Sequence, residues 1–106
     1  MHSTDTTVYE VLAEPNRRRI LDLLREGERP VTDLLNELPI AQPTVSKHLK
    51  LLRQAGLVSV RQDAQRRFYQ LRAAPLAEVD EWLEPYREHW RGRLDRLESH
   101  LDSLPE

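Results

Sequence analysis

The chain has 106 residues, of which 39% are hydrophobic and 32% are charged, and it contains no cysteine. This length supports one domain with a modest core, and the lack of cysteine excludes both a disulfide framework and a thiolate metal site. No run approaches the roughly 18 apolar residues of a membrane-spanning helix, and the N-terminal residues lack the order of a signal peptide, so we expect a cytoplasmic protein without a membrane partner.

The charges are distributed unevenly, although the net charge is only −2. Residues 40–75 contain seven basic residues against one acidic residue, Asp63, so this segment carries +6 and the remainder −8. A local basic patch, more than the overall charge, indicates a nucleic-acid partner. The alternative interpretation is a basic face that is simply solvated.

Two short helices are predicted at the start of the chain. The first runs from Thr4 to Ala13 and ends at Glu14, because the residue before a proline is disfavoured in a helix. Pro15 opens the second helix, which runs from Asn16 to Glu26 and ends before a glycine. Three arginines fill the first turns of that second helix, where the helix dipole disfavours cations. We expect them to be solvated or paired with carboxylates rather than to contact DNA: Arg17, Arg18 and Arg19.

A helix-turn-helix is predicted next, over residues 32–56. Val31 is compatible with a strand of one or two residues, and Thr32 is expected to cap a helix from Asp33 to Leu38. Pro39 ends this helix, and residues 40–42 form the turn into the following one. Two short helices joined by so tight a turn are typical of DNA-binding proteins.

The second helix of this motif, predicted over residues 43–55, is amphipathic. Pro43 suits a first helical position, and Gly56 suits a left-handed cap against which Leu57 packs. An apolar stripe on one face consists of Val45, Leu49 and Leu52. The opposite face carries hydrogen-bonding and cationic side chains, as a helix in the DNA major groove requires.

We assign two roles to that polar face. Base reading is predicted for Gln42, Thr44, Ser46 and, as one of two equal alternatives, His48. His48 contacts a base or phosphate in the first alternative and packs its ring on the preceding helix in the second. Phosphate binding is predicted for Lys47, Lys50 and Arg53.

After Gly56 the apolar period changes from helical spacing to alternation, which predicts a two-stranded hairpin over residues 58–71. Such a wing, placed beside a recognition helix, can reach the DNA backbone or minor groove. The residues expected to do so are Gln65, Arg66 and Arg67. The tip lacks glycine, so we expect a longer loop built on a type I turn.

The last segment, residues 76–104, shows apolar residues at steps of three and four, close to a heptad pattern. It is too long to bury against so small a domain, and we expect it to pair with a second copy, together with residues 5–13. A cap on the domain within one chain is the alternative. Pro85 is expected to kink or divide the helix. The predicted interface residues are Val8, Leu12, Tyr86, Trp90, Leu94, Leu97 and Leu101.

Other potential sites have less support in the sequence. Of the three aromatic residues Trp82, Tyr86 and Trp90, the last two fall on the apolar pattern and are predicted to form dimer core, with a ligand pocket between subunits as the alternative. His89 and His100 lie about three turns apart, so they are read as solvated or dimer-packed, with a metal bound across two chains as the alternative. Neither a catalytic constellation nor a phosphate-binding glycine loop is present, so we expect no enzyme activity and no cofactor.

The order of elements from Leu12 to Leu71, and above all the stretch QPTVSKHLKLLRQAGL at residues 42–57, resembles the ArsR/SmtB family of bacterial winged-helix repressors. The resemblance implies a homodimer that pairs through its first and last helices. It also implies binding to an inverted repeat near the protein's own promoter, block of transcription, and release by an inducer or metal.

The resemblance does not extend to the two common metal sites of the family. Pro30 and Thr32 stand where the thiolate-binding members have cysteines. The last helix offers Asp80-x-Trp82, then Arg93 and Arg96, in place of the carboxylate and histidine ligands of the zinc- and nickel-sensing members. The chain therefore resembles the members that sense no metal, and its inducer would be an unknown small molecule or protein.

Together these observations predict a mainly helical winged helix-turn-helix with a small β-hairpin, forming a single domain over residues 1–106. The predicted function is that of a homodimeric transcriptional repressor that binds double-stranded DNA. Its two recognition helices would lie roughly 34–36 Å apart. The alternative is a winged-helix protein-interaction module that acts through its C-terminal helix and has little affinity for DNA.

Overall fold

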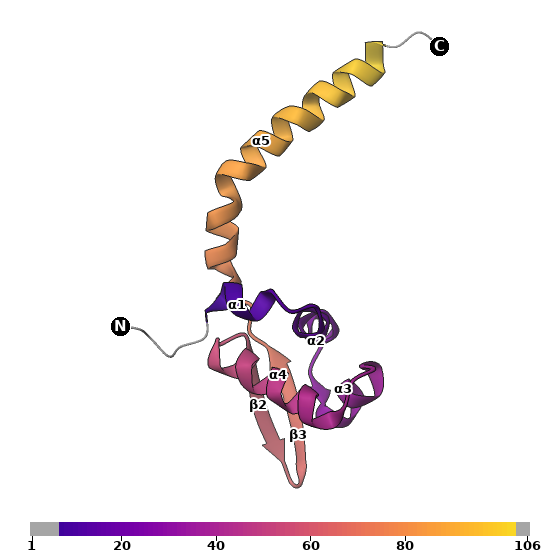
Figure 1. Ribbon diagram of the computed structural model, residues 1–106, viewed down its shortest axis with the longest axis vertical. Helices are drawn as coiled ribbons and strands as arrows, with labels where there is room; N and C mark the ends of the chain where they lie inside the picture. Colours follow the sequence, from indigo (N-terminus) through magenta and orange to yellow (C-terminus); the bar gives the residue numbers. More distant parts are fainter. Residues whose placement is uncertain (1–6, 104–106) are drawn as a thin grey trace.

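The computed structural model describes residues 7–103 and shows a small domain from which one long helix projects (Figure 1). Five helices and three strands follow one another, and the predicted fold class is confirmed. They are α1 (Val8–Leu12), α2 (Pro15–Arg25), β1 (Arg29–Pro30), α3 (Val31–Glu37), α4 (Gln42–Gln54), β2 (Val58–Asp63), β3 (Arg66–Leu71) and α5 (Leu76–Ser103).

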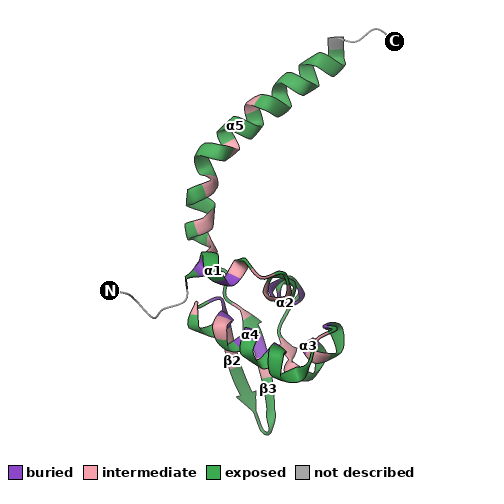
Figure 2. Ribbon diagram, viewed as in Figure 1, coloured by how far each residue is buried: buried purple, intermediate pink, exposed green. Residues whose placement is uncertain are grey.

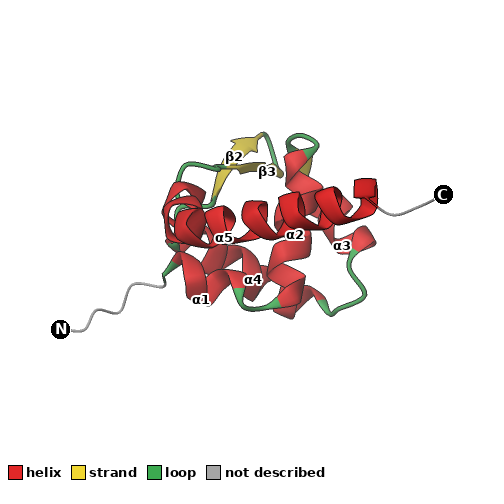
Figure 3. Ribbon diagram, turned by 90° about the horizontal axis from the view of Figure 1, so that it is seen from above, coloured by secondary structure: helices red, strands yellow, loops and turns green. Residues whose placement is uncertain are grey.

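The three strands form an antiparallel sheet in the order β1-β3-β2, which lies to one side of the helices when seen from above (Figure 3). The wing hairpin runs from the Val58↔Leu71 pair to the Asp63↔Arg66 pair. The strand expected near Val31 instead comprises Arg29 and Pro30, and Pro30 is tolerated there because β1 is an edge strand.

The core lies between the helices and the sheet. α2 contributes most of its apolar side chains, and Leu34, Val45, Leu49, Leu52 and Leu57 are essentially inaccessible to solvent. Leu57 is held there by the end of α4, where Gly56 adopts a φ of +78° and the Leu57 amide donates to the Leu52 carbonyl at 3.0 Å. The left-handed cap expected at Gly56 is thus confirmed, and it directs the chain from α4 into the wing.

Two helix starts differ from the prediction. α1 begins at Val8, where the Thr7 hydroxyl accepts from the Glu10 amide at 3.1 Å; the rest of the predicted start, residues 4–6, lies outside the described residues. α3 begins at Val31 with Pro30 at the N-cap and no side-chain capping bond, so the prediction of Thr32 as cap is wrong. Pro30, with a φ of −69° and a ψ of 155°, starts the helix before Thr32 is reached.

The wing turn also differs from the prediction. Asp63 and Arg66 are paired, which leaves a loop of only Ala64 and Gln65. Ala64 has a φ of +57°, the only positive φ among the non-glycine residues of the described chain. A positive φ at this position is what primed two-residue turns require. The expectation of a longer type I loop is therefore wrong, and the turn forms without glycine because the ladder on both sides holds it.

The helix α5 is continuous through Pro85, which removes one internal hydrogen bond but does not divide it. Figure 1 shows that it bends along its length. Apart from its first turns, it leaves the domain and is exposed on most of its surface (Figure 2). The alternative in which this helix caps the domain of its own chain is therefore wrong.

Candidate nucleic-acid interface

The helix α4 is oriented by its apolar stripe. Val45, Leu49 and Leu52 are buried in the core, so the opposite face of the helix must point outward. All the polar and cationic residues predicted on that face are exposed: Gln42, Thr44, Ser46, Lys47, Lys50 and Arg53. Gln54, which the sequence analysis did not single out, lines a shallow hollow beside Lys50 and Arg53. This face can therefore meet a ligand without any rearrangement of the core.

The cations of α4 are available to an external anion. Within residues 7–103, neither Lys47, Lys50 nor Arg53 forms a salt bridge. All three occupy one surface at helical spacing, which suits the repeating phosphates of a nucleic-acid backbone.

The wing is less basic than its sequence suggests. Arg61 donates to both carboxylate oxygens of Glu28, at 2.8 and 3.1 Å, and lies 3.7 Å from Asp63. These hydrogen bonds lower the pKa of the Glu28 carboxyl. Glu28 lies outside residues 40–75, so the +6 of that segment overstates the charge that its surface presents. Arg61 is thereby a structural residue of the wing rather than a free cation.

The tip of the wing carries the residues that the sequence analysis proposed for the DNA flanks. Gln65, Arg66 and Arg67 are exposed and, with the start of α3, line a pocket of about 180 Å³. The guanidinium of Arg66 lies 5.1 Å from the centre of the Phe68 ring, and that of Arg61 lies 4.7 Å from it. These cation–π contacts hold the charged side chains near the hairpin.

His48 faces the protein interior rather than the exposed surface of α4. It is 8% exposed, its Nδ1 lies 3.3 Å from Nη1 of Arg17, and its Nε2 lies 3.6 Å from a carboxylate oxygen of Glu14. Its assignment as a base-reading residue is therefore wrong. The second alternative, a packed ring, holds, but the ring meets α2 and not α3. The helical period could have predicted this burial. His48 follows Val45 by three residues and therefore lies on the same face of α4 as the apolar stripe.

Burial lowers the pKa of His48; Glu14 opposes that effect, while Arg17 and Lys47 add to it. The unfolded chain therefore binds a proton near pH 6.5 that the folded chain still excludes. We expect the free energy of unfolding to decrease as the pH falls from 7 to 5, by at most about 1.4 kcal/mol per pH unit for this group. Urea unfolding at several pH values tests this, and His48→Gln should flatten the dependence. An equal slope in both proteins would contradict it.

The arginines at the start of α2 bind backbone carbonyls of α1. Nε of Arg17 donates to the Val11 carbonyl at 2.8 Å, and a guanidinium nitrogen of Arg18 donates to that of Leu12 at 2.7 Å. Arg18 is exposed, as expected, and Arg17 is half-buried. Within residues 7–103 neither side chain forms a salt bridge with a carboxylate, so the expected pairing is wrong for these two. Carbonyls at the end of α1 have no partner within the helix, so they accept the guanidinium donors.

The helix α5 carries an exposed apolar stripe. Tyr86, Trp90, Leu94, Leu97 and Leu101 are each between 47% and 61% exposed. Val8 is only 6% exposed, so its assignment to an interface between chains is wrong, because it packs within its own chain. Leu12 is half-buried.

Tyr9, a residue not singled out from the sequence, joins this exposed region. Its hydroxyl donates to the Glu78 carbonyl at 3.2 Å, and its ring meets Trp82 edge-on at 6.3 Å between centroids. Trp82 in turn lies 5.1 Å from Tyr86. Tyr9, Trp82 and Tyr86 thus form an aromatic cluster that joins α1 to the base of α5. The cluster is still about half exposed.

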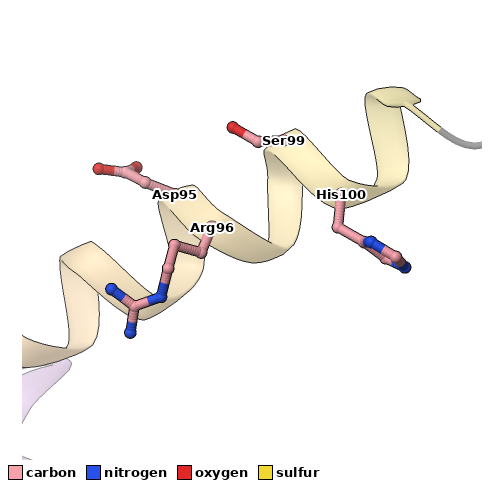
Figure 4. Close-up of a pocket in the computed structure, with 4 residues that line it drawn as sticks. All are labelled: Asp95, Arg96, Ser99 and His100. Atoms are coloured by element: carbon pink, nitrogen blue, oxygen red, sulfur yellow. The ribbon is translucent and has the colours of Figure 1, made fainter.

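The described residues show neither a metal centre nor a membrane-spanning helix. Within residues 7–103 no three metal-binding side chains come together. Near the end of α5 a shallow hollow is lined by four polar residues, of which Asp95 and Ser99 lie on one side of the helix and Arg96 and His100 on the other (Figure 4). None of the described helices is both long and apolar enough to cross a membrane.

Comparison with known proteins gives consistent matches. Residues 14–60 match the family described as "Bacterial regulatory protein, arsR family". The chain is 33% identical to the transcriptional repressor SdpR of Bacillus subtilis, over 72% of this chain and 84% of SdpR. It is 39% identical to the arsenical resistance operon repressor of Staphylococcus aureus, over 70% and 71% of the two chains. A crystal structure of a possible transcriptional regulator for arsenical resistance superposes with a TM-score of 0.66 at 38% identity, covering 91% of this chain and 95% of the other.

Proposed function

The chain belongs to the arsR family of bacterial regulatory proteins and is a DNA-binding transcriptional repressor rather than an enzyme; on this basis we propose that it acts as a homodimer on an inverted-repeat operator in its own promoter region. The observation that carries the proposal is the division of α4 into a buried apolar stripe and an exposed polar face. That division leaves one helix surface free to enter a major groove.

On α4 we assign base reading to Gln42, Thr44 and Ser46, which occupy its N-terminal end, and phosphate binding to Lys47, Lys50 and Arg53. The wing residues Gln65, Arg66 and Arg67 contact the flanking backbone or minor groove. His48 is excluded from this set because it is buried. We propose that the chain forms a single domain, with the helix-turn-helix at 32–56 and the wing at 58–71.

The dimer in this proposal is formed by α5 and α1. The exposed stripe on α5 is long, apolar and unburied in a single chain, which makes it suitable for pairing with a second copy. Together with Leu12, Tyr9 and Trp82 extend it onto α1. In the alternative function, the same stripe binds a different protein. The association state of the isolated chain distinguishes this alternative from the homodimer.

The signal that releases the repressor from DNA is proposed to be something other than a thiolate-bound metal. Two of the relatives are arsenical resistance operon repressors. This chain has no cysteine, and soft metals and arsenicals need such ligands. We propose an unknown small molecule or protein as the inducer.

Fluorescence anisotropy tests the proposal directly. The full chain is titrated into labelled DNA from upstream of its own gene and into random DNA, at two salt concentrations, with and without zinc. We expect tight binding that prefers the upstream DNA, weakens with salt and does not respond to zinc. Equally weak binding to both would reject autoregulation, and a monomeric chain that also lacks DNA affinity would favour the protein-interaction alternative.

Two single variants separate base reading from phosphate binding. Ser46→Ala should reduce the ratio of operator to random-DNA affinity, because it removes a hydrogen bond to a base edge. Arg66→Ala should weaken binding to both DNAs alike and reduce the salt slope by about one per bound subunit, because each subunit loses a single phosphate contact. If Ser46→Ala weakens both DNAs to the same degree, Ser46 does not read bases.

A further inference from the structure

A partly buried polar cluster connects three helices beneath the proposed DNA-binding surface. At its centre is Arg17, whose Nε donates to the Val11 carbonyl at 2.8 Å and whose Nη2 donates to the Glu10 carbonyl at 3.3 Å. Its remaining nitrogen, Nη1, reaches Nδ1 of His48 at 3.3 Å. One guanidinium therefore contacts the last turn of α1 and the middle of α4 at once.

The geometry determines the protonation state of His48. A guanidinium has only donors, so Nδ1 must be the accepting nitrogen and the ring proton must be on Nε2, which faces Glu14 at 3.6 Å. Protonation of Nδ1 would remove the acceptor and place a second cation beside Arg17. The charged groups that face the ring are Glu14, which favours the protonated form, and Arg17 and Lys47, which oppose it.

Glu14 strengthens the cluster from the side of α2. It is the N-cap of that helix, and its carboxylate accepts from the Arg17 amide at 3.1 Å. The side chain and the backbone of Arg17 are therefore both held, and the guanidinium has little freedom to follow α4 if that helix moves.

The other end of this connection is the exposed region of α1 and α5. Tyr9, in α1, donates to the Glu78 carbonyl and packs on Trp82, both in α5. A displacement of α5 would therefore move α1, and the carbonyls of α1 are those that hold Arg17. Figure 1 shows α1 at the base of α5, between that helix and the domain.

We infer that Arg17 is a positioning residue for DNA recognition, which holds α4 through His48 and thereby transmits the position of α1, and the protonation of His48, to the recognition helix. The inference rests on the proposed role of α4 in base reading. It assigns to the Glu14–Arg17–His48 cluster the connection between the exposed face of α1 and α5 and the DNA-binding surface.

The chain offers a matched control for this inference. Arg18 also donates to a carbonyl of α1, that of Leu12 at 2.7 Å, and this bond does not involve α4. Arg17→Gln and Arg18→Gln therefore remove the same charge. The first removes two bonds to α1 and the contact with His48, whereas the second removes one bond to α1 only. His48→Gln keeps an acceptor for Arg17 and cannot be protonated.

The experiment measures affinities for a duplex selected from a random pool by the wild-type protein and for a scrambled duplex, at pH 7.5 and pH 5.5. We expect Arg17→Gln to lower the ratio of the two affinities about tenfold, the size of one lost buried hydrogen bond, while Arg18→Gln leaves the ratio unchanged. The wild-type ratio should fall between pH 7.5 and pH 5.5, and His48→Gln should abolish that fall. A purely structural role would lower the melting temperature without a change in the pH profile.

Equal losses of the ratio for Arg17→Gln and Arg18→Gln, or a pH profile that His48→Gln does not alter, would overturn the inference. If the wild-type protein selects no duplex, the proposed function fails instead, and amide hydrogen exchange of the free protein decides on Arg17. We then expect the amides of α4 to exchange faster in Arg17→Gln than in Arg18→Gln. Equal exchange in the two variants would overturn the inference. Arg17→Lys, which keeps the charge but lacks the planar set of donors, repeats the comparison if Arg17→Gln does not fold.

Discussion

Replacing Leu94 and Leu97 by lysine is expected to convert the protein into a monomer. The two side chains are 61% and 53% exposed in the single chain and lie on one stripe of α5. Burial of each leucine in an interface contributes about 1.5 to 3 kcal/mol, and the substitutions place four cations in a dimer interface. Sedimentation at micromolar concentrations measures the change, which should be from two chains to one.

The loss of the dimer should also weaken operator binding by two orders of magnitude or more. A monomer contacts one half-site, and the effective concentration that joins the second half-site to the first is lost. Affinity for short random DNA should change much less, because the α4 surface is untouched.

A control with the same charge change is available on the opposite face of α5. Ala77 and Ser99 are exposed. Ala77 lies nine residues from Tyr86 and Ser99 lies two residues from Leu97, and at 3.6 residues per turn each spacing turns the side chain away from the stripe. Ala77→Lys with Ser99→Lys should remain dimeric. If both double variants sediment as dimers, the stripe is not the interface; if the wild-type chain is itself a monomer, the homodimer proposal is rejected.

Replacing Lys47 and Lys50 by alanine should weaken binding to all DNA by about thirtyfold per bound subunit at about 0.15 M salt, because each subunit loses two phosphate contacts. The slope of log affinity against log salt concentration should fall by about two per bound subunit for the same reason. Alanine is compatible with the helix, and both residues are exposed, so little effect on folding is expected. Anisotropy titrations at four salt concentrations provide both quantities.

The matched control removes two arginines from α2. Arg19 and Arg25 are exposed, and within residues 7–103 neither forms a salt bridge. Arg19→Ala with Arg25→Ala lowers the net charge equally, yet it should leave the salt slope nearly unchanged. Equal slopes for the two double variants would show that α4 contributes only through the overall charge of the protein.

Much of the fold was predictable because its signals are local. The break at Glu14-Pro15, the apolar stripe of α4 and the left-handed Gly56 each depend on a few neighbouring residues. The alternation after Gly56 likewise predicted the wing. The apolar stripe also predicted which residues of α4 form its exposed polar face, since a helix that buries one apolar face presents the other to solvent.

Local signals failed where a distant partner decided the outcome. His48 has the spacing of the apolar stripe, but it is polar, and only the approach of Arg17, 31 residues away, shows why it is buried. From the sequence, Arg61 contributes one positive charge to the basic segment. In the structure it pairs with Glu28, which lies 33 residues away in the chain. In the same way, Val8 and Tyr9 are adjacent, but only the packing of α1 shows which is buried and which is exposed.

Periodicity, proline and glycine act over a few residues, and for this reason the order of the elements, the helix-turn-helix and the family were predictable from the amino acids alone. The folded chain was needed to see which charges are neutralised, which side of α1 is exposed and how Arg17 joins α1 to α4. Each of these depends on contacts between residues far apart in the chain, and the energy of such a contact is set by burial and distance, which no stretch of sequence contains.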